Sequence, residues 1–220
     1  MKKSIVVFTR VPWHGDTKTR LRPLLTPDDC AEFQSCMLRD VLAQCRMTGF
    51  HVTVCYTPFE RRYLLEPLLH GESVELQSEG TLREKMADAM KKELERFDAC
   101  VMVGSNTPLL THETLAEAFS LLEDYDMAFA PTTDGGYYLS GMKKFCPDVF
   151  RLASVDKSAI LRRTMQTVSA LGLTAGICTV SHNLGLKEDL LQLASEIDRG
   201  QLQCPATRQF LASRGFLRTF

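Results

Sequence analysis

A cationic cluster follows the first apolar segment of the chain, in the stretch VFTRVPWHGDTKTRLRPLL. Pro12 and Gly15 are enough to turn a chain, so a simple turn leaves Arg10, Lys18 and Arg20 unexplained. Their ammonium and guanidinium groups suit the oxygens of a diphosphate or triphosphate, and a glycine lets the main chain approach a ligand closely. A phosphate-binding loop and a solvated cationic surface explain the stretch equally well. It is not a Walker P-loop, because the GxxxxGK[ST] spacing is absent.

Two later loops also carry residues that could do chemistry. GSNTPLLT places Ser105 and Asn106 directly after a buried apolar run, although a plain strand-to-helix connection capped by Thr111 explains that loop as well. In PTTDGGYYLSG an Asp-Gly turn accounts for part of the pattern. It does not account for the second glycine, which could let a ligand or a metal approach the backbone. The candidates in this loop are Asp134, Gly135, Gly136 and Tyr137.

The elements that position these loops alternate between short apolar runs and amphipathic helices. The runs SIVVFT, HVTVCYT, VELQ, DACVMVG and DMAFAPT predict strands, and a further strand is expected after TTDGG. The predicted helices cover residues 27–48, 59–69, 81–97, 111–125, 155–172, 186–198 and 205–214. This alternation predicts a single α/β domain over residues 1–220, a Rossmann-like three-layer sandwich with a mostly parallel sheet and helices on both faces. Ligands bind beyond the carboxyl ends of such strands, where all three loops are expected.

Composition narrows the class of partner. The 220 residues are 45% hydrophobic, and the formal net charge of -1 argues against the broad basic field of a nucleic-acid-binding protein. The first apolar run, Ile5 to Phe8, is too short for a signal peptide or a membrane span. Eight cysteines without a CxxC pair indicate reduced thiols in a cytoplasmic protein. The C-terminal tail, residues 200–220, is expected to pack on the core, with contact in a homodimer as the second alternative.

Together the three loops resemble the selenodomain-associated, or radical-SAM-associated, transferases, a family with the GT-A glycosyltransferase fold in the nucleotide-diphospho-sugar transferase superfamily. The likeness covers about residues 4–195. The motif F-x-K-x-P-x-x-G-x-x-K-T-R-L is similar to FTRVPWHGDTKTRL here, with Arg10 in place of lysine. QSEGTLREKM, which contains Gln77 and Gly80, looks like the family's Q-x-x-G-x-L-G-E-R-M, and PTTDGGYYLSG is similar to P-x-x-D-G-G-Y-Y-L-x-G.

The resemblance implies a nucleotide-dependent transferase. The favoured expectation is a glycosyltransferase that uses a nucleotide-sugar donor; the alternative is a nucleotidyltransferase that moves a nucleotidyl group from an NTP to a phosphorylated acceptor. On this reading Lys18, Arg20 and Asp134 are the catalytic candidates. The residues expected to bind the nucleotide and its phosphates are Arg10, Pro12, Gly15, Lys18, Arg20, Gln77, Ser105 and Asn106, and those expected in the acceptor pocket are Asp134, Gly135, Gly136 and Tyr137.

Two departures from the family pattern bear on the metal. The family has G-S-D-x-P-x-L in the second loop and D-V-D-T-x-E-D-L near the end, whereas Asn106 and Asn183 stand here in place of aspartates. In a GT-A-like transferase these carboxylates would hold Mg²⁺ or Mn²⁺ against the diphosphate. Asp134 and Asn106 would form a weak metal site here, or none. A third expectation is therefore a nucleotide-binding protein whose catalysis is impaired.

Overall fold

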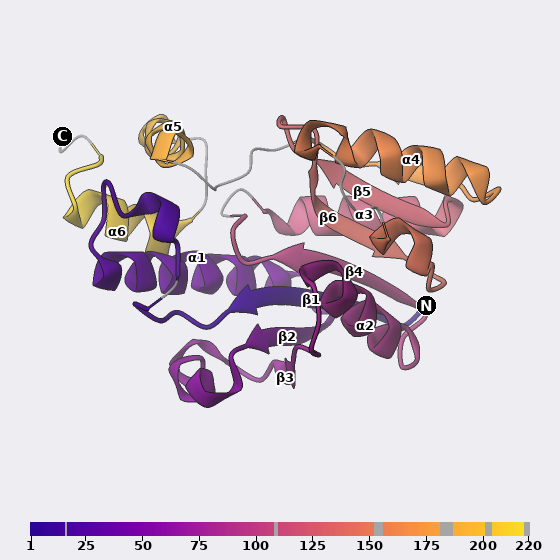
Figure 1. Cartoon of the computed structure of the whole chain (residues 1–220), viewed down its shortest axis with the longest axis horizontal. Helices are drawn as coiled ribbons and strands as arrows, with labels where there is room; N and C mark the ends of the chain where they lie inside the picture. Colours follow the sequence, from indigo (N-terminus) through magenta and orange to yellow (C-terminus); the bar gives the residue numbers. More distant parts are fainter. Residues whose placement is uncertain (16, 108–109, 152–155, 181–186, 201–203, 218–220) are drawn as a thin grey trace.

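A mixed sheet of seven strands organises the computed structural model, which describes the chain except residues 16, 108–109, 152–155, 181–186, 201–203 and 218–220 (Figure 1). The strand order within this described part is β3-β2-β1-β4-β6-β5-β7. β6 is antiparallel to both of its neighbours, and the other pairings are parallel. The strands are β1 (Lys3–Arg10), β2 (His51–Thr57), β3 (Ser73–Leu76), β4 (Ala99–Gly104), β5 (Met127–Pro131), β6 (Tyr137–Met142) and β7 (Ala175–Ile177).

Helices cover both faces of this sheet. They are α1 (Pro27–Met47), α2 (Leu82–Leu94), α3 (His112–Asp124), α4 (Ile160–Ala170), α5 (Lys187–Asp198) and α6 (Pro205–Ser213). Buried residues of α1 and α3 share one apolar cluster with the sheet, whereas those of α2 and α4 share another. Side chains alternate between the two clusters along each central strand: Ile5 and Val7 point to the first, and Val6 points to the second. The predicted three-layer α/β fold is confirmed.

Local capping signals fix where several helices begin. Thr26 accepts a hydrogen bond from the backbone of Asp29, whose carboxylate accepts in return from the backbone of Thr26. Thr81 and Glu84 form the same reciprocal capping box before α2, and Thr111 caps α3. These caps set the first residue of each helix.

Two predicted helices differ from the structure, and one strand was not predicted. The expected helix over 59–69 is instead two 3₁₀ segments, Phe59–Leu64 and Glu66–Leu68, because Pro67 lacks an N–H and disfavours a helical residue before it. α4 begins only at Ile160, after a 3₁₀ turn at Lys157–Ala159. β7 was not predicted, because three residues are too few to show a periodicity.

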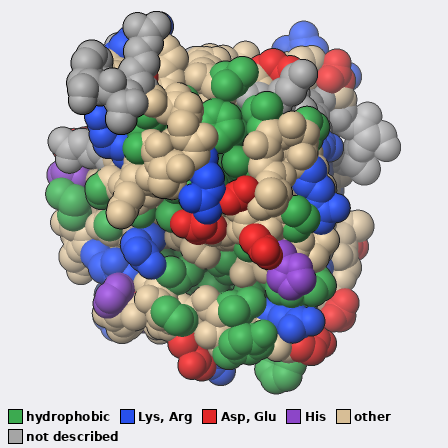
Figure 2. All heavy atoms as spheres, turned by 90° about the vertical axis from the view of Figure 1, so that its left-hand side faces the viewer, with side chains coloured by type: hydrophobic (Ala, Val, Ile, Leu, Met, Phe, Trp, Pro, Cys, Tyr) green, Lys and Arg blue, Asp and Glu red, His purple; other side chains and the backbone are tan. Residues whose placement is uncertain are grey.

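The carboxyl ends of β1, β2 and β4 lie at the same edge of the sheet, toward the left in Figure 1. The chain enters β6 at this edge too, since β6 runs antiparallel to β4. Figure 2 looks at the molecule from this side and shows acidic, basic and apolar side chains interspersed. The described side chains on this face thus carry charges of both signs, in line with the net charge of -1.

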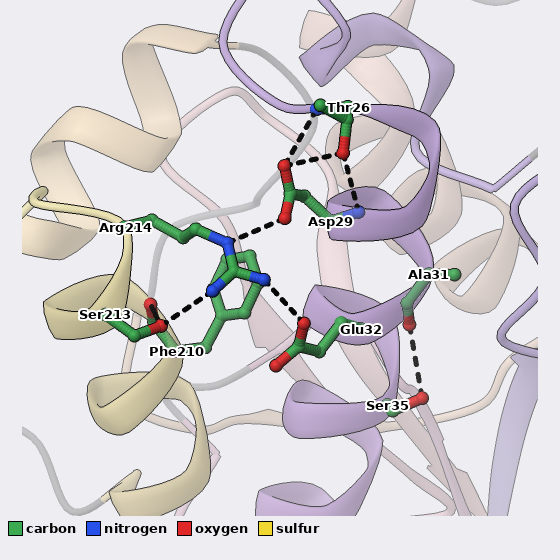
Figure 3. A network of polar contacts seen from close by, with 8 residues as sticks. All are labelled: Thr26, Asp29, Ala31, Glu32, Ser35, Phe210, Ser213 and Arg214. Carbon is green, nitrogen blue, oxygen red and sulfur yellow. Dashed lines mark hydrogen bonds and ion pairs between the residues drawn. The ribbon is translucent and has the colours of Figure 1, made fainter.

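The C-terminal helices form a third apolar cluster with the start of α1. Leu21 and Phe33 are buried in one cluster with Leu190 of α5 and Phe210 of α6. Figure 3 shows the polar rim of this cluster, where Arg214 donates to Asp29 over 2.6 Å and to Glu32 over 2.7 Å. Deeper in the interface, Asp40 accepts hydrogen bonds from the backbone N–H groups of residues 206 and 207, at the start of α6. Helix α6, within the predicted tail, thus packs on α1, and α5 and α6 brace the segment that follows the cationic loop.

None of the helices that the structure describes combines the length and the apolar character needed to cross a membrane.

Candidate functional site

A cavity of about 570 Å³ opens at the carboxyl edge of the sheet. Its walls come from the ends of β1, β2 and β4, from the start of β6 and from the first turns of α2. Parallel strands bring their carboxyl ends together at one edge, so loops far apart in sequence meet here. A volume of this size fits a nucleotide or another small ligand.

The charged side chains in the described part of the cavity wall are all cationic: Arg10, Lys18 and Lys85. Arg10 ends β1, Lys18 lies in the loop after it, and Lys85 lies in the second turn of α2. No carboxylate is among the wall residues that the structure describes. The cavity therefore favours an anionic ligand by simple Coulomb attraction.

Lys18 has an unusual backbone conformation and a shifted pKa. Its backbone is left-handed, with φ at 52°, and its carbonyl oxygen accepts a hydrogen bond from the backbone N–H of Leu21 over 2.8 Å. Burial lowers the pKa of Lys18 to about 7, although Cys30 and Asp189 act in the opposite direction. A left-handed lysine that is kept from its usual charge is a strained arrangement of the kind found at binding sites.

The loop that carries Lys18 is held from within. The Thr17 hydroxyl lies between the Val11 carbonyl and the Trp13 N–H, at 3.3 Å from each. The Arg22 guanidinium donates to the Gly15 carbonyl over 2.8 Å. A Cβ on Gly15 would lie 2.1 Å from the Trp13 ring, so this glycine makes room for the indole, whereas the sequence suggested that it makes room for a ligand.

A buried polar network joins the strand ends behind the cavity. Gln34 Nε2 donates to Ser105 Oγ over 2.8 Å, and the Thr9 hydroxyl also lies 2.8 Å from Ser105 Oγ. Gln77 Nε2 donates to the carbonyls of Thr9 and Cys55, at 2.9 and 3.1 Å. Because these two bonds use both of its N–H groups, Gln77 can offer a ligand only the acceptor Oε1. Ser105 and Gln77 thus line the cavity and also fix its shape.

The third loop is braced by Asp134. Its Oδ1 accepts from the Thr132 hydroxyl and, over 3.3 Å, from the Gly136 N–H. A Cβ on Gly135 would lie 2.2 Å from the Ser158 carbonyl oxygen, and one on Gly136 would lie 3.0 Å from the Thr132 hydroxyl. These glycines therefore have local packing reasons, beyond the ligand approach that the sequence suggested.

The structure brings together six of the sequence-predicted site residues in the cavity wall: Arg10, Lys18, Gln77, Ser105, Asn106 and Tyr137. The wall does not include Pro12, Gly15, Arg20, Asp134, Gly135 or Gly136. Arg20 is exposed in the 3₁₀ turn Thr19–Leu21, and Asn183 lies outside the described residues. Sequence reasoning missed Lys85 and Met86, which looked like part of an ordinary amphipathic helix.

The donor set suits an anion better than a divalent cation. Mg²⁺ and Mn²⁺ prefer carboxylate oxygens as protein ligands, but the described wall offers the Asn106 amide and no carboxylate. The described residues form no group of three His, Cys, Asp or Glu side chains that could hold a metal ion. Asp134, the other predicted ligand, already uses Oδ1 within its own turn. The described residues therefore do not fit a resident divalent metal.

Comparison with known structures defines the class of protein. The chain matches the crystal structure of a protein from Desulfovibrio desulfuricans G20, assigned as a nucleotide-diphospho-sugar transferase, with a TM-score of 0.88 and 25% identity over 97% of this chain and 95% of that one. A CMP-2-keto-3-deoxy-manno-octonic acid synthetase solved with CTP shares the fold alone, with a TM-score of 0.56 and 11% identity over 91% of this chain and 100% of that one. The chain has the nucleotide-diphospho-sugar transferase fold.

Sequence comparison identifies a relative and the family of the chain. A 2-phospho-L-lactate guanylyltransferase from Methanocorpusculum labreanum is 30% identical over 162 residues, which cover 73% of this chain and 68% of the relative. The family model described as "Uncharacterized protein conserved in bacteria (DUF2064)" matches residues 40–156. The chain belongs to the DUF2064 family. The narrower relation to selenodomain-associated transferases stays a prediction.

Proposed function

We propose that this protein is a nucleotidyltransferase, which moves a nucleotidyl group from an NTP to a phosphorylated acceptor. The observation that carries the proposal is the cavity at the carboxyl edge of the sheet, whose described charged residues are all cationic. The 30% identical guanylyltransferase supports nucleotidyl transfer and makes GTP the first donor to test. This ordering reverses the sequence-based preference for a glycosyltransferase.

In the proposed reaction an acceptor phosphate oxygen attacks the α-phosphorus of the NTP. A new P–O bond forms, the bond from the α-phosphorus to the bridging oxygen breaks, and pyrophosphate leaves with the electron pair. Negative charge grows on that leaving group, so Arg10 and Lys18 are proposed to stabilise it by charge-assisted hydrogen bonds. Removal of one such donor lowers kcat by about 100- to 1000-fold in well-studied sites.

The remaining predicted residues take supporting roles. Gln77 Oε1 and the Asn106 amide are proposed to contact the nucleoside, because both line the cavity and can hydrogen-bond to a base or a sugar. Arg20 is proposed to contact the outer phosphates from its exposed place near Lys18. Asp134 is proposed to hold the third loop in shape beside the acceptor, rather than to bind a metal.

A glycosyltransferase with a nucleotide-sugar donor is the second candidate. It is favoured by the structural match to a protein assigned as a nucleotide-diphospho-sugar transferase. Both reactions place a diphosphate leaving group beside the same cations, so the phosphate contacts alone do not separate them. The third candidate, a binding protein with impaired catalysis, rests on Asn106 standing where the resembling family has an aspartate.

Isotope labelling separates the three candidates. The protein is incubated with a mixture of phosphorylated acceptors and either α- or γ-labelled GTP, and the products are resolved by chromatography. Nucleotidyl transfer puts the α label into a new product and the γ label into pyrophosphate. In a parallel incubation with a sugar-labelled nucleotide sugar, label transfer to an acceptor would indicate a glycosyltransferase instead. Saturable nucleotide binding without either product would indicate the binding protein.

A further inference from the structure

The cavity has an apolar side that phosphates do not need. Arg10 and Lys18 come from the end of β1 and the loop after it, whereas α2 and the strands beside it contribute Leu82, Met86 and Met102. Phosphate groups gain nothing from thioether and leucine side chains. The apolar side therefore has room for a second molecule, or for the uncharged part of one.

One face of α2 forms much of this side. Leu82, Lys85 and Met86 are three and four residues apart, so they lie together on the helix surface, and all three line the cavity. Leu82 is 63% exposed, although it is a large apolar residue at the start of a helix. An exposed leucine that faces a cavity suits contact with a ligand.

Lys85 differs from two nearby cations that pair with carboxylates. Lys92 lies 2.8 Å from Asp88, and Arg96, just after the helix, reaches Glu93 and Glu75. Among the described residues no carboxylate pairs with Lys85, which is half-buried in the cavity wall. A partly desolvated ammonium group without a protein counterion favours an anion from outside.

Tyr137 closes the apolar side from β6. Its ring lies 5.1 Å from that of Phe129, and burial raises the pKa of its hydroxyl, which therefore stays neutral. This hydroxyl hydrogen-bonds with Thr164 of α4, so Tyr137 offers the cavity its ring rather than a donor. Lys85 thus supplies the donor, and Tyr137, the leucine and the methionines form an apolar wall.

We propose that Lys85 is the specificity-determining residue of an acceptor subsite, formed with Leu82, Met86, Met102 and Tyr137, that takes a small acid with a short apolar body. This inference rests on the proposed function, in which a nucleotide occupies the side of Arg10 and Lys18. Lys85 binds the phosphate or carboxylate of the acid, and the apolar wall contacts its carbon skeleton. Neutral polyols and large sugars lack this combination.

Binding without turnover tests the subsite. Phosphoenolpyruvate, glycerol 3-phosphate, pyruvate and uncharged glycerol are titrated by calorimetry into the wild type, Lys85→Met, Lys85→Arg and the control Lys91→Met. Lys91 is exposed on the same helix and outside the cavity wall. Loss of a charged hydrogen bond is expected to weaken anion binding in Lys85→Met by about 10- to 100-fold. Lys85→Arg should restore most of the anion affinity. Comparing the two phosphorylated probes with pyruvate shows whether the subsite prefers a phosphate or a carboxylate.

Nucleotide binding is read separately through fluorescence of Trp13, the single tryptophan, which lies in the cationic loop. Weaker acid binding with unchanged nucleotide binding in Lys85→Met supports the subsite. The subsite is overturned if Lys85→Met and Lys91→Met bind the acids equally well, or if Lys85→Met loses only nucleotide binding. A wild type that binds none of the acids also overturns it. A wild type that binds the acids through Lys85 but binds no nucleotide would support the subsite while refuting the proposed function.

Discussion

The perturbed Lys18 amine predicts that nucleotide binding takes up a proton. Burial lowers the pKa of the free amine to about 7, and Cys30 of α1 and Asp189 of α5 are the nearby groups that oppose this shift. A bound triphosphate adds several negative charges and raises that pKa again. The affinity for the nucleotide is therefore greatest below about pH 7, and it falls as the pH rises from the pKa of Lys18 in the free protein toward its pKa in the complex.

The size of this effect follows from linkage. At about pH 8, roughly one free molecule in ten carries a protonated Lys18, so binding takes up about 0.9 proton. If the bound pKa returns to its ordinary range near 10, Kd rises by about 20-fold between about pH 7.5 and pH 9. The terminal phosphate of the nucleotide has finished titrating below this window, since its pKa is about 6 to 7.

Isothermal titration calorimetry with GTP in two buffers of different ionisation enthalpy measures the uptake directly. Lys18→Arg is the matched control, because a guanidinium stays protonated throughout this window. It should bind GTP with almost no proton uptake and a nearly constant Kd. Zero uptake by the wild type at about pH 8, or equal uptake by Lys18→Arg, would refute the assignment of the perturbed amine to the phosphate site.

Three further predictions concern stability and metal. Lys18→Met should raise the unfolding free energy at about pH 7 by an amount on the order of 2 kcal/mol, allowing for solvent access, because the folded state disfavours the charged amine. This gain in stability should fade as the pH rises toward about 10.5, where the unfolded amine also loses its proton. Thermal unfolding at several pH values measures it. Asp40→Ala should lower it by about 1–2 kcal/mol in urea titrations, since two N–H groups of α6 lose their acceptor, whereas Asp40→Asn should lose less. EDTA should change Kd for GTP by less than about threefold, and Asn106→Asp should make binding depend on Mg²⁺; a wild type that needs Mg²⁺ would contradict the metal-poor site.

Local signals explain what could be predicted from the sequence. The caps at Thr26, Thr81 and Thr111 each depend on residues three positions apart, so α1, α2 and α3 begin where expected. The alternation of apolar runs and helices fixed the class of fold, and the rule that ligands bind beyond parallel strands placed three loops at one edge. The prediction of a helix over 59–69 was wrong, because it gave more weight to the spacing of apolar residues than to Pro67.

Contacts between distant segments explain what could not be predicted. The reason for Gly15 is the Trp13 ring, and one reason for Gly135 is the backbone of Ser158, which follows more than twenty residues later. Lys85 has the sequence context of a solvated helix position, and only the placement of α2 against β1 and β4 turns it toward the cavity. Motif reading thus found the loops, whereas the cavity wall needed the tertiary structure.

Fluorescence of Trp13 during titration with GTP tests the central claim most directly, because the single tryptophan lies in the loop that carries Lys18. The wild type and Lys91→Met should show the same saturable change. Lys18→Met should bind at least about tenfold more weakly at pH 7, since it loses a charged hydrogen bond to phosphate. An unresponsive wild type, or an unchanged Kd in Lys18→Met, would contradict a nucleotide site in this cavity.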